Sequence, residues 1–262
     1  MISQDKCSLW QVRFVEELKN NDQKIWEMDY PYKRFAVASA LALEKITEAF
    51  GSSETSGEFY FISMPDAKGA PAEYGNLLGD IPWQIISLNG EKLFWIPGKA
   101  ILRNSGTMST KFFQYLVAFS FYEAELRKLE KEIKESWSSV EKDIEFTYQV
   151  TPSSIQQSSH VNERTRQVTL QRMRCIRIKE LLDRVSSSAG LLEQLFERLD
   201  CERRLDSVEA QLEIYEDVYE LANDRISEFK YFHVEAKLEI FIIFLLLAEV
   251  VVMILELWML GK

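Results

Sequence analysis

The pattern of apolar and polar positions changes twice along this chain, and the last pattern is a continuous apolar run near the C-terminal end. Residues 1 to 106 hold short apolar runs separated by most of the glycines and prolines, whereas long helical patterns follow from residue 107. The sequence therefore predicts the α+β class. We expect a small α+β domain at 1–106, a helical hairpin or coiled-coil stalk at 107–238, and a transmembrane helix at 239–262.

The N-terminal region carries signals for both strands and helices. Aromatic or β-branched runs at 58–64, 83–88 and 92–96 predict strands. Asn89-Gly90 predicts a type I′ hairpin between the last two, because both residues tolerate a positive φ. The runs 9–18 and 35–50 have helical spacing and predict two helices.

The middle of the chain predicts long helices. Residues 111–145 begin with an aromatic half, typical of a packed core, and continue with charged pairs at helical spacing. The segment 149–162, with Pro152 and several serines, predicts the bend of a hairpin or a flexible linker. A helix over 164–185, a break at the three serines 186–188 and a long helix from Leu191 follow.

The last helix has a heptad seam, which predicts packing against another helix. Its apolar positions alternate by three and four residues and comprise Leu205, Val208, Leu212, Tyr215, Tyr219, Ala222, Ile226, Phe229, His233, Ala236 and Ile240. The partner is either a helix of the same chain or a second copy. Tyr and His suit a tight parallel dimer poorly, so we expect an intrachain antiparallel hairpin that also forms a homo-oligomer.

Residues Ile240 to Leu260 form an almost unbroken apolar run. About 20 such residues cross a bilayer, and this run predicts a tail anchor; the alternative is a buried helix of a globular core. Lys and Arg before the run outnumber Lys262 after it, which places the N-terminal part in the cytoplasm. The predicted location is a bacterial inner (plasma) membrane, with the lipid bilayer as a partner.

Two acids interrupt the run, Glu249 and Glu256, and they lie on a helical stripe that differs from the seam. Acids inside a bilayer face protein or water. We therefore expect them to face neighbouring spans or a central cavity in an assembly larger than a dimer. A protonated, hydrogen-bonded carboxyl and a hydrated conducting path both fit this position.

Charge narrows the possible partners. A net charge of −10 argues against DNA, because binding to phosphates needs a basic surface. One basic patch stands out against this background and comprises Arg164, Arg166, Arg172, Arg174, Arg177 and Lys179. It fits pairing with acidic residues of neighbouring helices, anionic lipid headgroups or RNA.

Candidate catalytic chemistry is sparse. The two histidines, His160 and His233, lack partners at metal-ligand spacing, and the three cysteines form no CxxC pair. Glycine spacing that would cradle a phosphate does not occur in the sequence. We predict a protein that is not an enzyme and that uses no cofactor and no metal.

Three segments of the C-terminal half stand out together: the run 199–205 (LDCERRL), the segment 235–239 (EAKLE) and the segment 246–250 (LLAEV). With these segments the C-terminal half resembles the required-for-meiotic-nuclear-division family, whose shared domain has no known function. The resemblance spans roughly residues 107–260. It implies a non-enzymatic, oligomeric inner-membrane protein with an unidentified protein or ribonucleoprotein partner.

Two functional hypotheses follow. The first is a membrane-anchored oligomeric scaffold that presents a cytoplasmic partner-binding domain. The alternative is an oligomeric membrane effector or channel, gated by that domain, with a role in defence. Glu249 and Glu256 are the residues on which the channel would depend.

Overall fold

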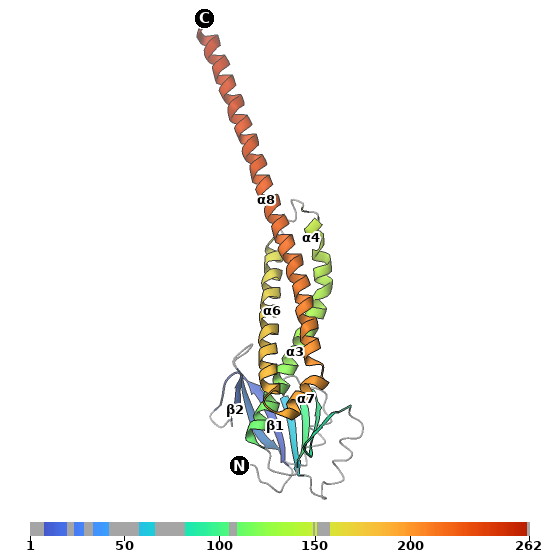
Figure 1. Ribbon diagram of the computed structural model, residues 1–262. Coiled ribbons are helices and arrows are strands. Elements are labelled where there is room, and N and C mark those ends of the chain that lie inside the picture. The colour runs from blue at the N-terminus through green and yellow to red at the C-terminus, as the bar shows by residue number, and fades with distance from the viewer. Residues whose placement is uncertain are drawn as a thin grey trace. The chain divides into compact units, whose positions relative to one another are not determined.

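The computed structural model describes residues 8–19, 24–28, 34–41, 58–65, 82–104, 109–148, 150 and 158–260. Within these ranges the side chains of residues 64, 65, 104 and 255–260 are not described. The described chain has a seven-stranded sheet followed by helices, which is the α+β class predicted from the sequence (Figure 1).

The sheet has the strand order β2-β3-β1-β4-β7-β6-β5, so β2 and β5 are its edge strands. Neighbouring strands pair antiparallel except β4 and β7, which run parallel. The strands are β1 (Ser8–Val15), β2 (Lys24–Met28), β3 (Arg34–Leu41), β4 (Glu58–Pro65), β5 (Gln84–Leu88), β6 (Glu91–Ile96) and β7 (Lys99–Asn104).

The hairpin prediction is confirmed. Leu88 pairs with Glu91 across a two-residue turn, and the turn residues Asn89 and Gly90 have φ of 49° and 86°. Both angles are positive, as a type I′ turn requires, and this turn matches the right-handed twist of its strands.

The two helices predicted near the N-terminus are wrong in their described parts. Residues 9–15 lie in β1 and residues 35–41 lie in β3, and the two strands pair with each other along their whole length. The rest of the predicted helix 35–50 lies outside the described residues. Short apolar runs fit either period, and here pairing between distant segments outweighs local preference.

Five helices follow in the described chain. They are α3 (Thr110–Asp143), α4 (Glu145–Tyr148), α6 (Ser158–Ser186), α7 (Gly190–Arg198) and α8 (Cys201–Leu260). The predicted break at serines 186–188 lies between α6 and α7. The long helix expected from Leu191 is divided at Asp200, whose positive φ of 49° ends α7 before α8 begins.

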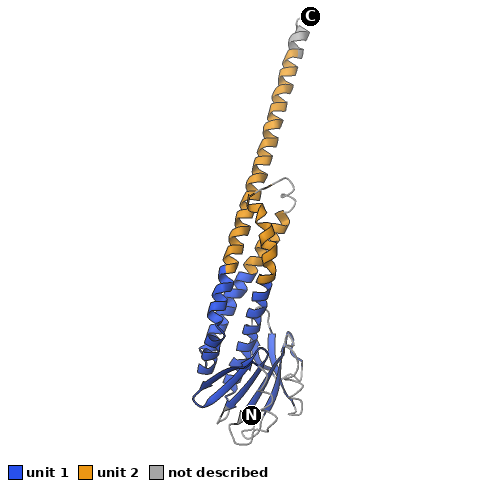
Figure 2. Cartoon of the chain, turned by 90° about the vertical axis from the view of Figure 1, so that its right-hand side faces the viewer, with its two compact units in different colours: residues 1–133, 171–210 blue, residues 134–170, 211–262 orange. Residues whose placement is uncertain are grey.

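The chain divides into two compact units, residues 1–133 with 171–210 and residues 134–170 with 211–262 (Figure 2). In the first unit, the aromatic start of α3 packs on the sheet. Phe113 lies 5.0 Å from Phe61 between ring centroids, and Phe121 lies 5.0 Å from Phe14. The aromatic half of this helix is therefore core, as the sequence predicts.

Both units contain segments of α3, α6 and α8 that contact one another. In the first unit Arg204 of α8 and Arg174 of α6 each pair with glutamates of α3. In the second, Tyr219 of α8 and His160 of α6 both approach Asp143 of α3. The predicted two-helix hairpin is thus a three-helix arrangement, because α6 packs beside the other two.

The predicted transmembrane helix is wrong. In the part of the chain that the structure describes, no helix has an apolar stretch of the length needed to cross a bilayer. The described side chains of α8 from Lys237 to Ile254 include three charged ones, those of Lys237, Glu239 and Glu249. Charged side chains at such positions oppose insertion. This finding overturns the tail-anchored, single-pass architecture and the inner-membrane location predicted from the sequence.

Candidate interaction sites

The first half of the heptad seam is the inner face of α8. Leu205, Leu212 and Tyr215 have no exposed surface, and Tyr219 and Ile226 are 1% and 2% exposed. Val208 is also buried, whereas Phe229 is half-buried and His233 is exposed. Within the described chain, the bundle therefore covers the seam from Leu205 to Ile226, covers Phe229 in part and leaves the seam exposed from His233 onward.

Beyond Lys230, α8 has no cover from the described part of the chain. Every residue from Tyr231 to Ile254 is exposed. The heptad phase continues through this segment without interruption at Ile240, Ile243, Leu247, Val250 and Ile254. We call residues 231–254 the bare segment of α8.

The bare segment is apolar on more than its seam. Between Ile240 and Ile254, the exposed side chains at all other heptad positions are also apolar except Glu249, which is exposed as well. Glu256 lies in the last helical residues, whose side chains are outside the described ones. A helix that is apolar on all sides is normally buried by other protein or by lipid.

The basic patch is largely paired within the chain. Arg174 of α6 lies 2.7 Å from Glu132 and 3.5 Å from Glu125 of α3. Lys179 lies 2.9 Å from Asp206 and 3.4 Å from Glu209 of α8. These contacts join neighbouring helices of the first unit, which is the charge matching that the sequence left open beside lipid and RNA.

Three other members of the patch have partners on their own helix. Arg166 pairs with Glu163 and Arg177 with Glu180, each three residues apart. Arg164 donates a hydrogen bond to Gln167. Arg172 also has a partner in the structure. Exposed pairs of this kind contribute little to stability.

A partly buried ion network joins α3 and α8 in the first unit. Arg204 donates a hydrogen bond of 2.8 Å to each carboxylate oxygen of Glu130 and one of 3.0 Å to Glu123. Arg127 also donates to Glu123, whose side chain is 1% exposed. The hydrogen bonds that Arg204 donates to Glu130 and to Glu123 raise its pKa further above its already high value. Two cations thus share the buried Glu123 carboxylate, and the contacts of Arg204 tie α8 to α3.

A second polar cluster lies in the other unit. Tyr219 donates a hydrogen bond of 2.9 Å to Asp143, and His160 Nε2 lies 3.6 Å from the same carboxylate. Burial, followed by the hydrogen bond to Asp143, raises the pKa of Tyr219. Its hydroxyl therefore stays protonated as a donor.

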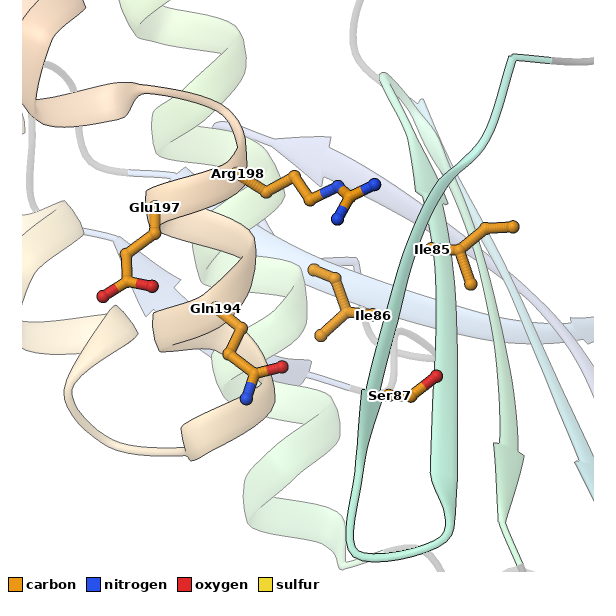
Figure 3. Close-up of a pocket in the computed structure, with 6 residues that line it drawn as sticks. All are labelled: Ile85, Ile86, Ser87, Gln194, Glu197 and Arg198. Atoms are coloured by element: carbon orange, nitrogen blue, oxygen red, sulfur yellow. The ribbon is translucent and has the colours of Figure 1, made fainter.

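A groove lies between the edge strand β5 and helix α7, with a volume of about 510 Å³. Six residues line it: Ile85, Ile86 and Ser87 of β5, and Gln194, Glu197 and Arg198 of α7. Arg198 reaches from α7 toward the strand, whereas Glu197 points away from it (Figure 3). The strand side of the groove is thus two isoleucines and a serine, and the helix side is polar, with both an acid and a cation.

Glycine lets α7 begin close to the end of β5. A Cβ atom placed on Gly190, the first residue of α7, would lie only 2.7 Å from Cδ2 of Leu88. Any other residue here would push against that side chain. Gly190 therefore sets the close contact of α7 with β5 at one end of the groove.

Catalytic or metal-binding arrangements do not emerge from these clusters. Within the described ranges, no group of three or more His, Cys, Asp or Glu side chains could hold a metal ion. Burial raises the pKa of the Cys175 thiol to about 11 and that of Cys201 to about 12. Such thiols are poor nucleophiles, because the thiolate is the reactive form.

Comparison with protein-family models and with curated proteins finds no match to this chain. The resemblance to the required-for-meiotic-nuclear-division family therefore stays a prediction. The sequence missed the groove and the ion network, although it singled out the run from Leu199 to Leu205 that contains Arg204. The sequence around Arg204 does not indicate its partners, because Glu123 and Glu130 lie in another helix, more than 70 residues away.

Proposed function

We propose that this protein is a non-enzymatic, self-assembling scaffold. The bare segment of α8 associates with the same segment of further copies, and the sheet-containing unit binds a partner. The observation that carries this proposal is the heptad seam, which is buried up to Ile226 and then continues in phase along the bare segment, where no other part of the described chain packs on it.

A second copy is the occupant that fits the bare segment, because it brings the same seam in the same phase. Aliphatic residues fill successive seam positions from Ile240 to Ile254, and such residues at a and d positions drive helix association in water. Neither Tyr nor Gly interrupts this part of the seam.

One partner helix would leave part of the surface uncovered. Large apolar side chains also occupy the positions away from the seam, including Phe241, Leu245 and Val252, each more than half exposed. Each side chain of this size contributes about 1.5 to 3 kcal/mol when it is fully buried. We therefore expect an assembly of more than two chains.

Neither part of this proposal, self-association through the bare segment or partner binding by the sheet-containing unit, requires a membrane. The scaffold and channel hypotheses from the sequence both took their membrane location from the predicted span. The scaffold hypothesis keeps its two other parts, an oligomerising helix and a partner-binding unit, and each rests on residues of its own.

The test is the mass of the full-length protein in aqueous buffer, measured by light scattering after size-exclusion chromatography. We expect the wild type to be larger than a dimer. Leu247→Glu places a charge on the seam of the bare segment and should lower the mass to that of smaller species. The matched control is Leu221→Glu, which adds the same charge to an exposed position of α8 outside the bare segment, and its mass should equal that of the wild type.

Two outcomes would contradict the proposal. One is a wild type that stays monomeric at the highest concentration tested. The other is a chain that binds added lipid vesicles as single copies, since lipid would then be what covers the bare segment.

A further inference from the structure

β5 is an edge strand of the described sheet, and its outer edge offers a second place where another chain can bind. Leu88 and Glu91 flank a two-residue turn, so they form a hydrogen-bonded pair of the antiparallel ladder. Hydrogen-bonded and non-hydrogen-bonded pairs alternate along the strands. Ile86 and Gln84 therefore also bond to β6, whereas the backbone groups of Ile85 and Ser87 point away from it.

Ile85 and Ser87 thus present two N–H and two C=O groups at the edge of the sheet. Among the described strands, none lies on that side of β5. Proteins usually protect such an edge with a short strand, charged residues, proline or a covering segment, because an open ladder pairs readily with another extended chain. β5 is short, with five residues, but it has neither a charged residue nor a proline between Gln84 and Leu88.

The side chains beside this edge favour a particular kind of strand. Ile85 is 47% exposed and gives an apolar contact for the side chain opposite it. Arg198 reaches toward the strand from α7 (Figure 3). Within the described residues Arg198 takes part in no ion pair, and it is exposed in an otherwise acidic protein.

We propose that β5 binds an extended peptide segment of a partner protein by adding it to the sheet as an eighth strand, with Arg198 pairing with a carboxylate of that segment. Main-chain hydrogen bonds would supply affinity and the side-chain contacts specificity, as in other cases of strand addition. This inference rests on the proposed scaffold function, since it names what the sheet-containing unit holds.

The probe is a short, fluorescently labelled peptide of alternating valine and threonine with one central glutamate. Its binding to the full-length protein is followed by fluorescence anisotropy. A second peptide carries glutamine in place of glutamate. We expect the wild type to bind the glutamate peptide about tenfold more tightly, the size of one charge-assisted hydrogen bond.

Ser87→Pro is the decisive variant. Proline removes one N–H that faces the open edge, and edge strands accept proline there because that N–H is not used in the sheet. The matched control Ser87→Ala keeps the N–H. We expect Ser87→Pro to weaken peptide binding at least about tenfold and Ser87→Ala to change it less than about twofold.

Arg198→Gln tests the charge in a residue exposed enough to leave the fold intact. It should remove the preference for glutamate over glutamine and leave binding of the glutamine peptide unchanged. Hydrogen exchange gives an independent measurement: the peptide should slow exchange of the Ile85 and Ser87 amides, whereas those of Gln84 and Ile86 are already protected by β6.

The proposal is overturned if the wild type binds neither peptide, or if Ser87→Pro binds as tightly as Ser87→Ala. Assembly mass is measured for each variant, so the two proposals fail separately. Loss of peptide binding with wild-type mass supports strand addition. A fall in mass caused by Ser87→Pro alone would show that β5 pairs with a second copy, which contradicts a partner peptide as the occupant.

Discussion

Arg204 of α8 makes a bidentate contact with Glu130 of α3. Its Nε donates to Oε1 and its Nη2 donates to Oε2, and both hydrogen bonds are 2.8 Å long. This planar geometry suits arginine and excludes lysine, which offers a single charged point. The third donor group, Nη1, reaches Glu123. Since both carboxylates lie on α3, one guanidinium fixes how α8 is aligned along that helix.

Arg204→Met should destabilise the protein by about 3 kcal/mol, because it leaves Glu123 and Glu130 without their shared partner in a poorly hydrated site. Arg203→Met is the matched control. Arg203 is adjacent, but its side chain is 83% exposed and pairs with Asp200, which is exposed as well, so the change should be within about 0.5 kcal/mol. Urea unfolding followed by circular dichroism measures both; equal effects would contradict a structural role for the network.

Tyr219→Phe should cost about 1 to 2 kcal/mol, because the buried Asp143 carboxylate loses a donor. The pKa of Tyr219 is raised in the folded protein, so folding favours the protonated phenol. That contribution is complete below the unfolded pKa of about 10 and is lost as the pH rises above it. As the pH rises above about 10, the free energy of unfolding of the wild type should therefore fall more than that of Tyr219→Phe. Unfolding curves of both proteins recorded over that pH range measure the difference.

Cys175 and Cys201 should react slowly with a thiol reagent in the folded protein. Burial raises both pKa values, to about 11 and about 12, so little thiolate is present at pH 8. In a Cys7→Ser background we expect labelling at least about 100-fold slower than in guanidinium chloride. Fast labelling of the native protein at pH 8 would show that the cysteines are accessible and activated.

Gly90→Ala should destabilise the β5–β6 hairpin by about 1 kcal/mol, because residue 90 has a φ of 86° and a Cβ is disfavoured there. Space is not the reason, since a Cβ at Gly90 would meet no atom within 4 Å. Asn89→Gly is the control and should be close to neutral, as glycine accepts the positive φ of 49°. Thermal unfolding distinguishes the two variants.

Local signals in the sequence sufficed for the parts of the fold that depend on near neighbours. The Asn89-Gly90 turn was predictable because two residues determine its backbone angles. The long helices were predictable because α3, α6 and α8 keep their apolar spacing over many turns. The residues 9–15 and 35–41 were not, since their strands exist by pairing with each other across a gap in sequence.

The candidate sites depended on facts that no local pattern contains. β5 is an edge strand only because β7 pairs with β4 in parallel and places β6 and β5 outside it. The partners of Arg174 and Lys179 could not be predicted, because they lie on α3 and α8 and depend on how these helices pack beside α6. The seam was visible in the sequence, but where its intrachain cover ends, after Ile226, was not.

The place of the bare segment in the chain has a consequence for synthesis on the ribosome. Translation proceeds at about 5 to 20 residues per second, and N-terminal parts fold first. The strands, α3 and α6 all precede residue 231, so they leave the ribosome before the bare segment of α8 does. Each nascent chain can complete its own bundle before it meets its neighbours, which keeps premature aggregation between half-made copies to a minimum.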